Sequence, residues 1–224
     1  MFHFAGGNSY SYRFMEPYLQ DFKIETVELP GRGMRSDENL LHDFEAVARD
    51  LFRQVSAKIR TPDFLLFGHS MGALLAFRVA QMLETQGRGP RHLVVSGNAG
   101  PTVSSNEKRY LLGNKEFISE LKKLGGLSAD FLQSEELLDY FLPILKADFQ
   151  VVEENGLKAG SLIQAPIYAI MGDTEKYGAH IANWSAYTVS GFASKMLEGN
   201  HFFIYDHAEE LGRILKSCYH RQPV

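Results

Sequence analysis

The stretch Phe64-Leu-Leu-Phe-Gly-His-Ser70-Met-Gly-Ala73 decides the fold that this sequence predicts. Its first four residues form an apolar run suited to a buried strand, and a long, mainly apolar helical pattern follows Ser70. Gly68-His-Ser-Met-Gly72 fits G-x-S-x-G, the pattern of a sharp turn that exposes a nucleophilic serine between a strand and a helix. Strand and helix nearly touch in such a turn, so small residues are needed on both sides of the serine. We therefore predict that Ser70 is a nucleophile.

Strand-length apolar segments and segments with helical spacing alternate along most of the chain. Such alternation predicts an α/β protein with a mostly parallel sheet and helices on both faces, here as one domain over residues 1–224. The predicted strands are Met1–Phe4, Lys23–Leu29, Asp63–Phe67, His92–Ser96, Ile167–Met171 and Ser194–Leu197. The predicted helices are Tyr10–Leu19, Phe44–Ile59 with Asp43 as its N-cap, Ser70–Gln86, Lys115–Leu124, Glu135–Val152, Ala179–Tyr187 and Glu209–Tyr219.

The chain start and one internal segment depart from this alternation. A strand that starts at residue 1 implies either that the sheet lacks its usual leading edge strands or that further residues precede it. Residues 101–160 contain helical patterns but no convincing strand. This insertion begins where a strand ends, at the edge where sites in open α/β sheets lie, so we expect a helical lid over the site.

A serine hydroxyl needs a base to become nucleophilic, and the base needs a carboxylate to orient it. In α/β proteins whose nucleophilic serine lies in such a strand-to-helix turn, the order along the chain is serine, acid, histidine. His201 follows the last predicted strand and is the preferred base; His207, at the start of the final helix, is the second choice. His69 lies inside the elbow, where its side chain should point away from the serine, so we assign it to packing.

Two carboxylates follow the strand Ile167–Met171 and could orient the histidine: Asp173 and Glu175. Physical reasoning alone does not separate them, because either side chain can hold an imidazole in the required tautomer. The negatively charged oxygen that forms during attack needs two backbone N–H donors. We expect one from Met71, directly after the nucleophile, and the other from Ala5 or Gly6 after the first strand.

Composition excludes several classes of function. The chain is 45% hydrophobic and 22% charged with a net charge of −4, so nucleic-acid binding, which favours a basic surface, is not indicated. The eight histidines show no metal-ligand spacing, and we expect neither a metal nor a cofactor. No signal-peptide pattern is present, and the single cysteine, Cys218, fits a reducing compartment, so we expect a cytoplasmic protein without membrane contact.

Four segments together resemble the type II thioesterases, stand-alone editing enzymes of polyketide and nonribosomal peptide synthesis with the α/β-hydrolase fold. The segments are Phe4-Ala-Gly-Gly-Asn-Ser9, Glu28-Leu-Pro-Gly-Arg-Gly33, Phe67-Gly-His-Ser-Met-Gly-Ala-Leu-Leu-Ala-Phe77 and Gly199-Asn-His-Phe-Phe203. The resemblance extends over residues 2 to about 215. It implies a Ser–acid–His triad that hydrolyses acyl thioesters on the phosphopantetheine arm of an acyl or peptidyl carrier protein.

Two departures from the family pattern bear on the site. His3-Phe4 replaces the proline-tyrosine that usually precedes Ala-Gly-Gly, so the shape of that loop is open. The family's aspartate stands three residues after the glycine that ends the strand. Counted from Gly172, that position is Glu175, which the resemblance therefore favours over Asp173.

Because carrier proteins are acidic, a net acidic enzyme needs a basic rim to bind one. The candidates are Lys108, Arg109, Lys115, Lys122 and Lys123 in the insertion, with Arg32 and Arg35. Aromatic residues of the insertion suit an acyl chain, although they suit the core of a lid equally well: Phe117, Phe131, Phe141 and Phe149. The alternatives are a small-molecule carboxylesterase on the same fold and a non-catalytic binding protein that retains it.

Overall fold

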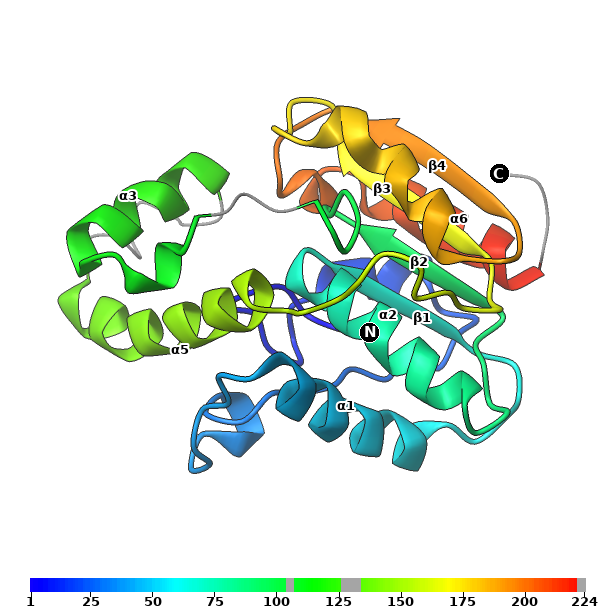
Figure 1. Cartoon of the computed structure of the whole chain (residues 1–224), viewed down its shortest axis with the longest axis horizontal. Helices are drawn as coiled ribbons and strands as arrows, with labels where there is room; N and C mark the ends of the chain where they lie inside the picture. Colours follow the sequence, from blue (N-terminus) through cyan, green and yellow to red (C-terminus); the bar gives the residue numbers. More distant parts are fainter. Residues whose placement is uncertain (104–106, 126–133, 221–224) are drawn as a thin grey trace.

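A four-stranded parallel sheet forms the centre of the molecule (Figure 1). The computed structural model describes residues 1–103, 107–125 and 134–220. The strands are β1 (Leu65–His69), β2 (His92–Ser96), β3 (Ile167–Gly172) and β4 (Phe192–Leu197), in the spatial order β1-β2-β3-β4. All three pairings are parallel, so the carboxyl ends of the four strands lie along one edge. Chemistry-bearing residues that follow these strands are therefore brought together at that edge.

Helices cover both faces of the sheet, as predicted. In β2, Leu93 and Val95 face the core formed with α1 (Phe44–Lys58) and α2 (Met71–Glu84), whereas Val94 faces the opposite core. This alternation follows from the two-residue period of a strand. The second core is closed by α6 (Ala208–His220) and the 3₁₀ helix η1 (Arg13–Tyr18). The 3₁₀ helix η4 (Gly178–Tyr187) joins the first core through Trp184 and Tyr187.

The segment between β2 and β3 forms a separate lobe beyond the carboxyl edge of the sheet (Figure 1). It contains η3 (Arg109–Leu111), α3 (Asn114–Leu124) and α5 (Glu135–Glu153), and no strand among its described residues. Phe117 of α3 packs edge-to-face on Phe149 of α5, with ring centroids 5.1 Å apart, inside a small apolar core of its own. The helical character predicted for residues 101–160 is confirmed for this described part.

The N-terminal part differs from the prediction. Residues 23–29 form no strand, and Met1–Phe4 contributes only an isolated parallel bridge between Phe2 and Gly68. Two backbone hydrogen bonds connect these segments: the Met1 ammonium donates to Glu25 O (2.6 Å) and Val27 N–H donates to Met1 O (3.2 Å). A ladder needs a longer run of such bonds, so apolar alternation alone is insufficient here.

Two predicted α-helices are instead 3₁₀ helices, η1 and η4. In η1, Pro17 has no N–H to donate, which limits a helical ladder. In η4, tertiary contacts dominate, because Trp184 Nε1 donates to Asn98 O (2.7 Å) and its ring packs on Phe77. Two short 3₁₀ helices complete the described elements: η2 (Gly33–Arg35) and η5 (Phe203–Tyr205). None of the described helices is long and apolar enough to cross a membrane.

Candidate active site

Ser70 occupies a strained turn between β1 and α2. Its φ of 56° and ψ of −116° make it the one non-glycine residue with positive φ in the described chain. A Cβ atom at Gly68 would overlap the carbonyl of Gly72, and one at Gly72 would overlap the carbonyl of Phe2. The Ser70 N–H donates to Ser96 O on β2 (2.7 Å), which fixes the turn to the sheet. The predicted elbow is thus present with the close contacts that require its glycines.

His201 connects Ser70 to Glu175. Its Nε2 lies 2.9 Å from Ser70 Oγ, and its Nδ1 lies 2.6 Å from Glu175 Oε2. The second carboxylate oxygen of Glu175 accepts the N–H of Gly172 (2.9 Å), which fixes the carboxylate plane. The side chains of His201 and Glu175 are only 16% and 8% exposed, so water competes little for these bonds. A carboxylate on Nδ1 leaves Nε2 free to take a proton from the serine.

Asp173 makes different contacts. Its Oδ1 accepts the N–H of Gly199 (2.9 Å), and its own N–H donates to Leu197 O (2.8 Å). Thr174 Oγ1 also donates to Gly199 O (2.8 Å). These bonds hold the loop that precedes His201, but they do not bring the Asp173 carboxylate to the imidazole. Of the two acids that the sequence left open, the structure brings Glu175 to the histidine.

Backbone donors near Ser70 differ in availability. Met71 is the first residue of α2, so its N–H has no acceptor within that helix. The N–H of Gly6 donates to Asp148 Oδ2 (2.8 Å) and is therefore occupied. Ala5 lines the cavities beside Ser70, and its N–H makes no hydrogen bond to another described residue. Between the two predicted alternatives, Ala5 retains the free donor.

The two other histidines considered from the sequence, His69 and His207, make no hydrogen bond to Ser70. His69 is fully buried and its Nδ1 lies 3.0 Å from Ser96 Oγ. Burial, and next the charge of the nearby His201, hold the pKa of His69 well below its usual value, so this imidazole is neutral. His207 donates from Nε2 to Glu198 O (2.7 Å) and is not in contact with the serine. Both contacts agree with structural roles.

Two cavities meet at Ser70. One has a volume of about 630 Å³ and extends toward Asn98, Glu153 and Lys176. The other has a volume of about 380 Å³ and is lined mainly by apolar and aromatic side chains, among them Leu145 and Tyr205. The residues common to both are Ala5, Ser70, Leu124, Phe149 and His201. The lobe formed by α3 and α5 therefore contributes Leu124 and Phe149 to the boundary of both cavities.

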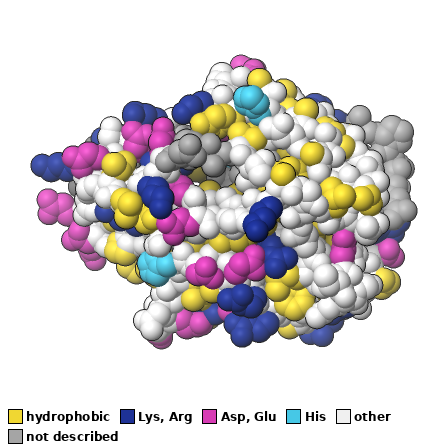
Figure 2. Space-filling model, in the orientation of Figure 1, with side chains coloured by type: hydrophobic (Ala, Val, Ile, Leu, Met, Phe, Trp, Pro, Cys, Tyr) yellow, Lys and Arg dark blue, Asp and Glu magenta, His cyan; other side chains and the backbone are white. Residues whose placement is uncertain are grey.

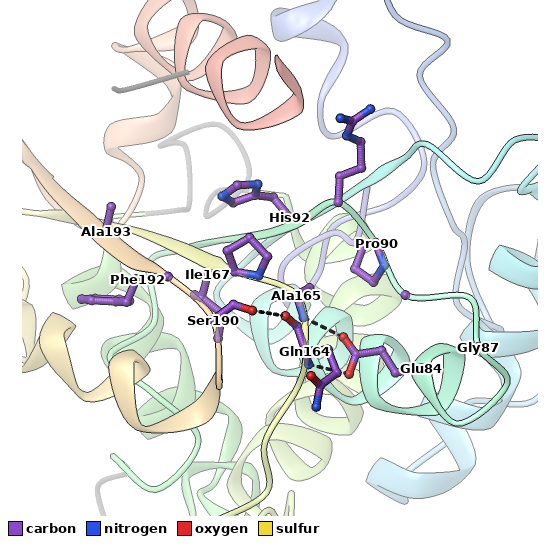
Figure 3. Close-up of a pocket in the computed structure, with 14 residues that line it drawn as sticks. Glu84, Gly87, Pro90, His92, Gln164, Ala165, Ile167, Ser190, Phe192 and Ala193 are labelled. Atoms are coloured by element: carbon purple, nitrogen blue, oxygen red, sulfur yellow. Dashed lines mark hydrogen bonds between the residues drawn. The ribbon is translucent and has the colours of Figure 1, made fainter. Parts of the chain in front are cut away.

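A larger depression of about 820 Å³ lies at the opposite, amino edge of the sheet (Figure 3). Glu84 points into it and accepts the N–H groups of Gln164 (2.7 Å) and Ala165 (2.8 Å). Neither Ser70 nor His201 lines this depression. Sites in parallel α/β sheets lie at the carboxyl ends of the strands, which is the edge where the cavities at Ser70 lie and this depression does not.

The cations considered for a basic rim are mostly paired. Arg32 is buried and forms two hydrogen bonds with Asp148, so its assignment to a surface rim is wrong. Figure 2 shows Lys and Arg mixed with Asp and Glu over the lobe of α3 and α5. The other ion pairs are Arg35 with Glu38 and Asp50, Lys108 with Glu154, Arg109 with Glu153, and Lys123 with Glu120. Exposed Lys115 and Lys122 form no ion pair with another described residue.

Three of the four aromatic residues considered for the insertion can be placed. Phe117 is core of the lobe, whereas Phe141 and Phe149 line the smaller cavity; Phe131 lies outside the described residues.

The contact between Arg32 and Asp148 was not predicted. The two residues are 116 positions apart, and no local pattern connects a turn arginine to one aspartate of a distant amphipathic helix. Among the described residues, no cluster of His, Cys, Asp or Glu is arranged to hold a metal ion.

Comparison with known proteins agrees with this geometry. A family model described as a thioesterase domain matches residues 1–219. Linear gramicidin dehydrogenase LgrE of Brevibacillus parabrevis is 34% identical over 96% of this chain and 85% of its own length. The RedJ thioesterase of the prodiginine pathway in Streptomyces coelicolor is 30% identical and superposes with a TM-score of 0.87, over 95% of this chain and 87% of RedJ.

The type II thioesterase BorB, from the borrelidin biosynthetic cluster, is 29% identical with a TM-score of 0.84, over 97% of this chain and 90% of BorB. The family model covers almost the whole chain, and the structural matches extend through the lobe as well as the sheet. The resemblance of the four motif segments is thereby confirmed. The chain belongs to the thioesterase family and is a type II thioesterase, a serine hydrolase with the α/β-hydrolase fold.

Proposed function

We propose that this thioesterase hydrolyses acyl or peptidyl thioesters carried on the phosphopantetheine arm of a carrier protein, and so clears stalled or incorrectly loaded chains in nonribosomal peptide or polyketide synthesis. One observation carries the proposal: a single imidazole lies between Ser70 Oγ and Glu175 Oε2, at 2.9 Å and 2.6 Å. This is the arrangement that nucleophilic attack by a serine requires.

In the first half of the reaction, Ser70 Oγ attacks the thioester carbonyl carbon and His201 Nε2 accepts the serine proton. The N–H groups of Ala5 and Met71 donate to the carbonyl oxygen as it becomes negative, while Glu175 holds the imidazolium. The carbon–sulfur bond then breaks, and the phosphopantetheine sulfur leaves as a thiol with the proton from His201. The product is an ester between Ser70 and the acyl group.

In the second half, water enters and His201 Nε2 removes its proton. The resulting hydroxide attacks the ester carbonyl, the same two N–H groups stabilise the oxyanion, and Ser70 leaves as its hydroxyl with the proton returned by His201. Release of the free acid restores the starting state. No cofactor is needed in either half.

We assign the lobe between β2 and β3, about residues 101–160, as a lid inserted in a single domain over residues 1–224. The two cavities at Ser70 support this assignment, because Leu124 of α3 and Phe149 of α5 line both of them. The smaller, more apolar cavity suits the acyl chain. The larger cavity, with its polar and charged lining, suits the phosphopantetheine arm, whose amides need hydrogen-bond partners.

Exposed Lys115 and Lys122 on α3 would attract an acidic carrier protein, because the other lysines and arginines considered for this role form ion pairs within the chain. Such charges act mainly on the rate of encounter, so their removal should raise KM more than it lowers kcat. We place the reaction in the cytoplasm, in line with the single buried cysteine.

The test measures hydrolysis of three substrates that share one acyl group: the thioester on a phosphopantetheinylated carrier protein, the coenzyme A thioester and the p-nitrophenyl ester. Preference for the carrier protein, with release of the free acid and loss of turnover in Ser70→Ala, supports the proposal. Since LgrE is named a dehydrogenase, the reactions are also run with a reduced nicotinamide coenzyme, NADH or NADPH; a reduced product in place of the free acid would contradict hydrolysis.

Two other results would overturn the proposal. Preference for the p-nitrophenyl ester over both thioesters would indicate a carboxylesterase. Absence of hydrolysis of all three substrates, together with no labelling of Ser70 by a fluorophosphonate, would indicate a binding protein that retains the fold.

A further inference from the structure

A buried ion pair connects the proposed lid to the loop that carries Ala5. Arg32 Nη1 donates to Asp148 Oδ2 (2.6 Å) and Nη2 donates to Oδ1 (2.7 Å), which is a two-point contact. Arg32 is 4% exposed and Asp148 is 1% exposed, so both charges are removed from water. Arg32 lies in the turn after Pro30, whereas Asp148 lies in α5. The planar fork of an arginine fixes a carboxylate in orientation as well as in distance.

The same carboxylate holds the backbone beside Ala5. Asp148 Oδ2 accepts the N–H of Gly6 (2.8 Å), so the peptide group that joins Ala5 to Gly6 is fixed from the lid side. Arg32 Nη1 also reaches Gly7 O (3.3 Å). The ion pair therefore contacts two successive residues of the loop: Gly6 donates its N–H to Asp148, and Gly7 accepts at its carbonyl oxygen from Arg32.

The peptide group on the other side of Ala5 is held by two further hydrogen bonds. Phe4 O accepts the N–H of Gly7 (2.9 Å) and the Nδ1–H of His3 (2.9 Å). Because a peptide group is planar, fixing the Phe4 carbonyl also fixes the direction of the Ala5 N–H. Both peptide groups that flank Ala5 are thus restrained, and the restraint on the Gly6 side comes from Asp148.

A purely structural role explains this arrangement poorly. Removing two charges from water costs much of the free energy that their attraction returns, and well-packed apolar residues in their place often leave a protein as stable or more stable. What apolar residues lack is an oxygen that accepts the Gly6 N–H. The carboxylate also leaves the Ala5 N–H as the free donor of the loop, because it occupies the neighbouring N–H.

We infer that Asp148 and Arg32 are positioning residues for the oxyanion: by holding the Ala5–Gly6 peptide group they complete the restraint on Ala5, so that the direction of the Ala5 N–H also depends on the position of α5. Leu145, one turn before Asp148, packs directly on Gly6 and lines the smaller cavity, so movement of α5 would disturb the loop and the acyl site together. The inference rests on the proposed roles of Ser70 and Ala5 and adds two residues that do not touch the substrate.

The test replaces the pair by apolar residues of similar size, Arg32→Met with Asp148→Leu. We expect kcat and the rate of Ser70 labelling by a fluorophosphonate both to fall on the order of 100-fold, with KM changed less than about threefold. Labelling is informative because the phosphoryl oxygen of the probe needs the same N–H donors as the oxyanion, and it requires no carrier protein.

The matched control is Arg35→Met with Asp50→Leu. Arg35 also makes two hydrogen bonds with one carboxylate, from Nη1 to Asp50 Oδ2 (2.6 Å) and from Nη2 to Asp50 Oδ1 (3.1 Å). This pair likewise joins the segment after Pro30 to a helix, but the helix is α1. We expect kcat and labelling of this variant to stay within about threefold of wild type, whether its thermal stability rises or falls.

Three results would overturn the inference: labelling of the folded Arg32/Asp148 variant at the wild-type rate, equal losses in both double variants, or a lower kcat with unchanged labelling. Should the double variant not fold, Arg32→Lys gives a milder form of the comparison, because a lysine keeps the charge but not the two-point hold on the carboxylate, with Arg35→Lys as its control. Failure of the carrier-protein assay while labelling responds as expected would contradict the proposed substrate but not the positioning roles.

Discussion

Glu175 stands three residues after Gly172 and presents Oε2 to His201 Nδ1 at 2.6 Å, while its Oε1 is held by the Gly172 N–H at 2.9 Å. The glutamate thus turns back over the end of its own strand to reach the imidazole. Asp173, two residues nearer the strand, uses its carboxylate on Gly199. The contrast between neighbouring acids gives a direct test of which one orients the histidine.

Glu175→Gln should lower kcat by a factor on the order of 10²–10⁴, because an amide in place of the carboxylate neither holds the correct imidazole tautomer nor stabilises the imidazolium. KM should change little. Asp173→Asn keeps an oxygen that can accept the Gly199 N–H, so its kcat should remain within about tenfold of wild type. The measurement is steady-state hydrolysis of an acyl thioester by both variants.

A larger loss of kcat in Asp173→Asn than in Glu175→Gln would contradict this assignment. Thermal unfolding of both variants serves as the control, since a loss that follows unfolding says nothing about the triad. Glu175→Asp adds a finer comparison: a shorter side chain on the same position should restore part of the activity that glutamine removes.

The elbow and the regular elements around it were predictable because their signals are local. Strand, turn and helix are contiguous between Phe64 and Gln86, and the glycines beside Ser70 follow from a contact that only the turn creates. The bounds of β2 were predicted as observed, His92–Ser96. In contrast, Lys23–Leu29 has the alternation of a strand, but among the described residues its backbone pairs with no other backbone than that of Met1. A strand depends on a partner strand that its own sequence does not contain.

Gly68→Ala and Gly72→Ala should each destabilise the protein by about 3 kcal/mol or more, because the new Cβ atoms would overlap backbone carbonyl groups that cannot rotate away. Gly191→Ala is the matched control. It also replaces a glycine hydrogen by a methyl group, but nothing lies within 4 Å of the added carbon. Urea unfolding of the three variants measures the difference, and a Gly72→Ala variant as stable as Gly191→Ala would contradict the close contact.

Glu84→Ala should destabilise the protein by about 1–3 kcal/mol without changing kcat, because the N–H groups of Gln164 and Ala165 would lose their acceptor at the amino edge of the sheet. The distance of this edge from Ser70 is the reason to expect unchanged activity. Exposed Glu16→Ala provides a control with the same change in charge. Urea unfolding and thioester hydrolysis are measured on the same preparations; a lower kcat at unchanged stability would indicate a functional role for the depression in Figure 3.

Residue type and order in the chain were sufficient to single out Ser70 and His201, which the structure brings within 2.9 Å of each other. They left Asp173 and Glu175 open because both follow the same strand, and only the direction of each side chain separates them. Arg32 was assigned to a surface because its burial depends on Asp148, a partner that lies in the inserted lobe. Long-range polar pairing of this kind has no local periodicity from which it could be read.

The stability of the protein should fall as the pH falls from about 6.5 toward 4, in part through His3. Burial, and then the charge of Arg32, lower the pKa of His3 to about 4 in the folded protein, whereas the unfolded chain titrates near the usual 6.5. Between these values the unfolded chain binds a proton that the folded protein does not. His3 therefore contributes its full stability above pH 6.5 and loses it as the pH falls through 4, by about 3 kcal/mol in total.

His3→Asn isolates this contribution, because an asparagine amide can still donate to Phe4 O but does not titrate. In urea unfolding between pH 7 and 4.5, the variant should lose less stability than wild type, with a slope against pH smaller by up to one proton, or about 1.4 kcal/mol per pH unit. Exposed His180→Asn should keep the wild-type slope. If the unfolding free energy of wild type and of His3→Asn changes equally with pH, the lowered pKa of His3 is contradicted. If the change is smaller in His3→Asn alone, the loss of stability in acid is assigned to the His3 imidazole, which holds the Phe4 carbonyl beside Ala5.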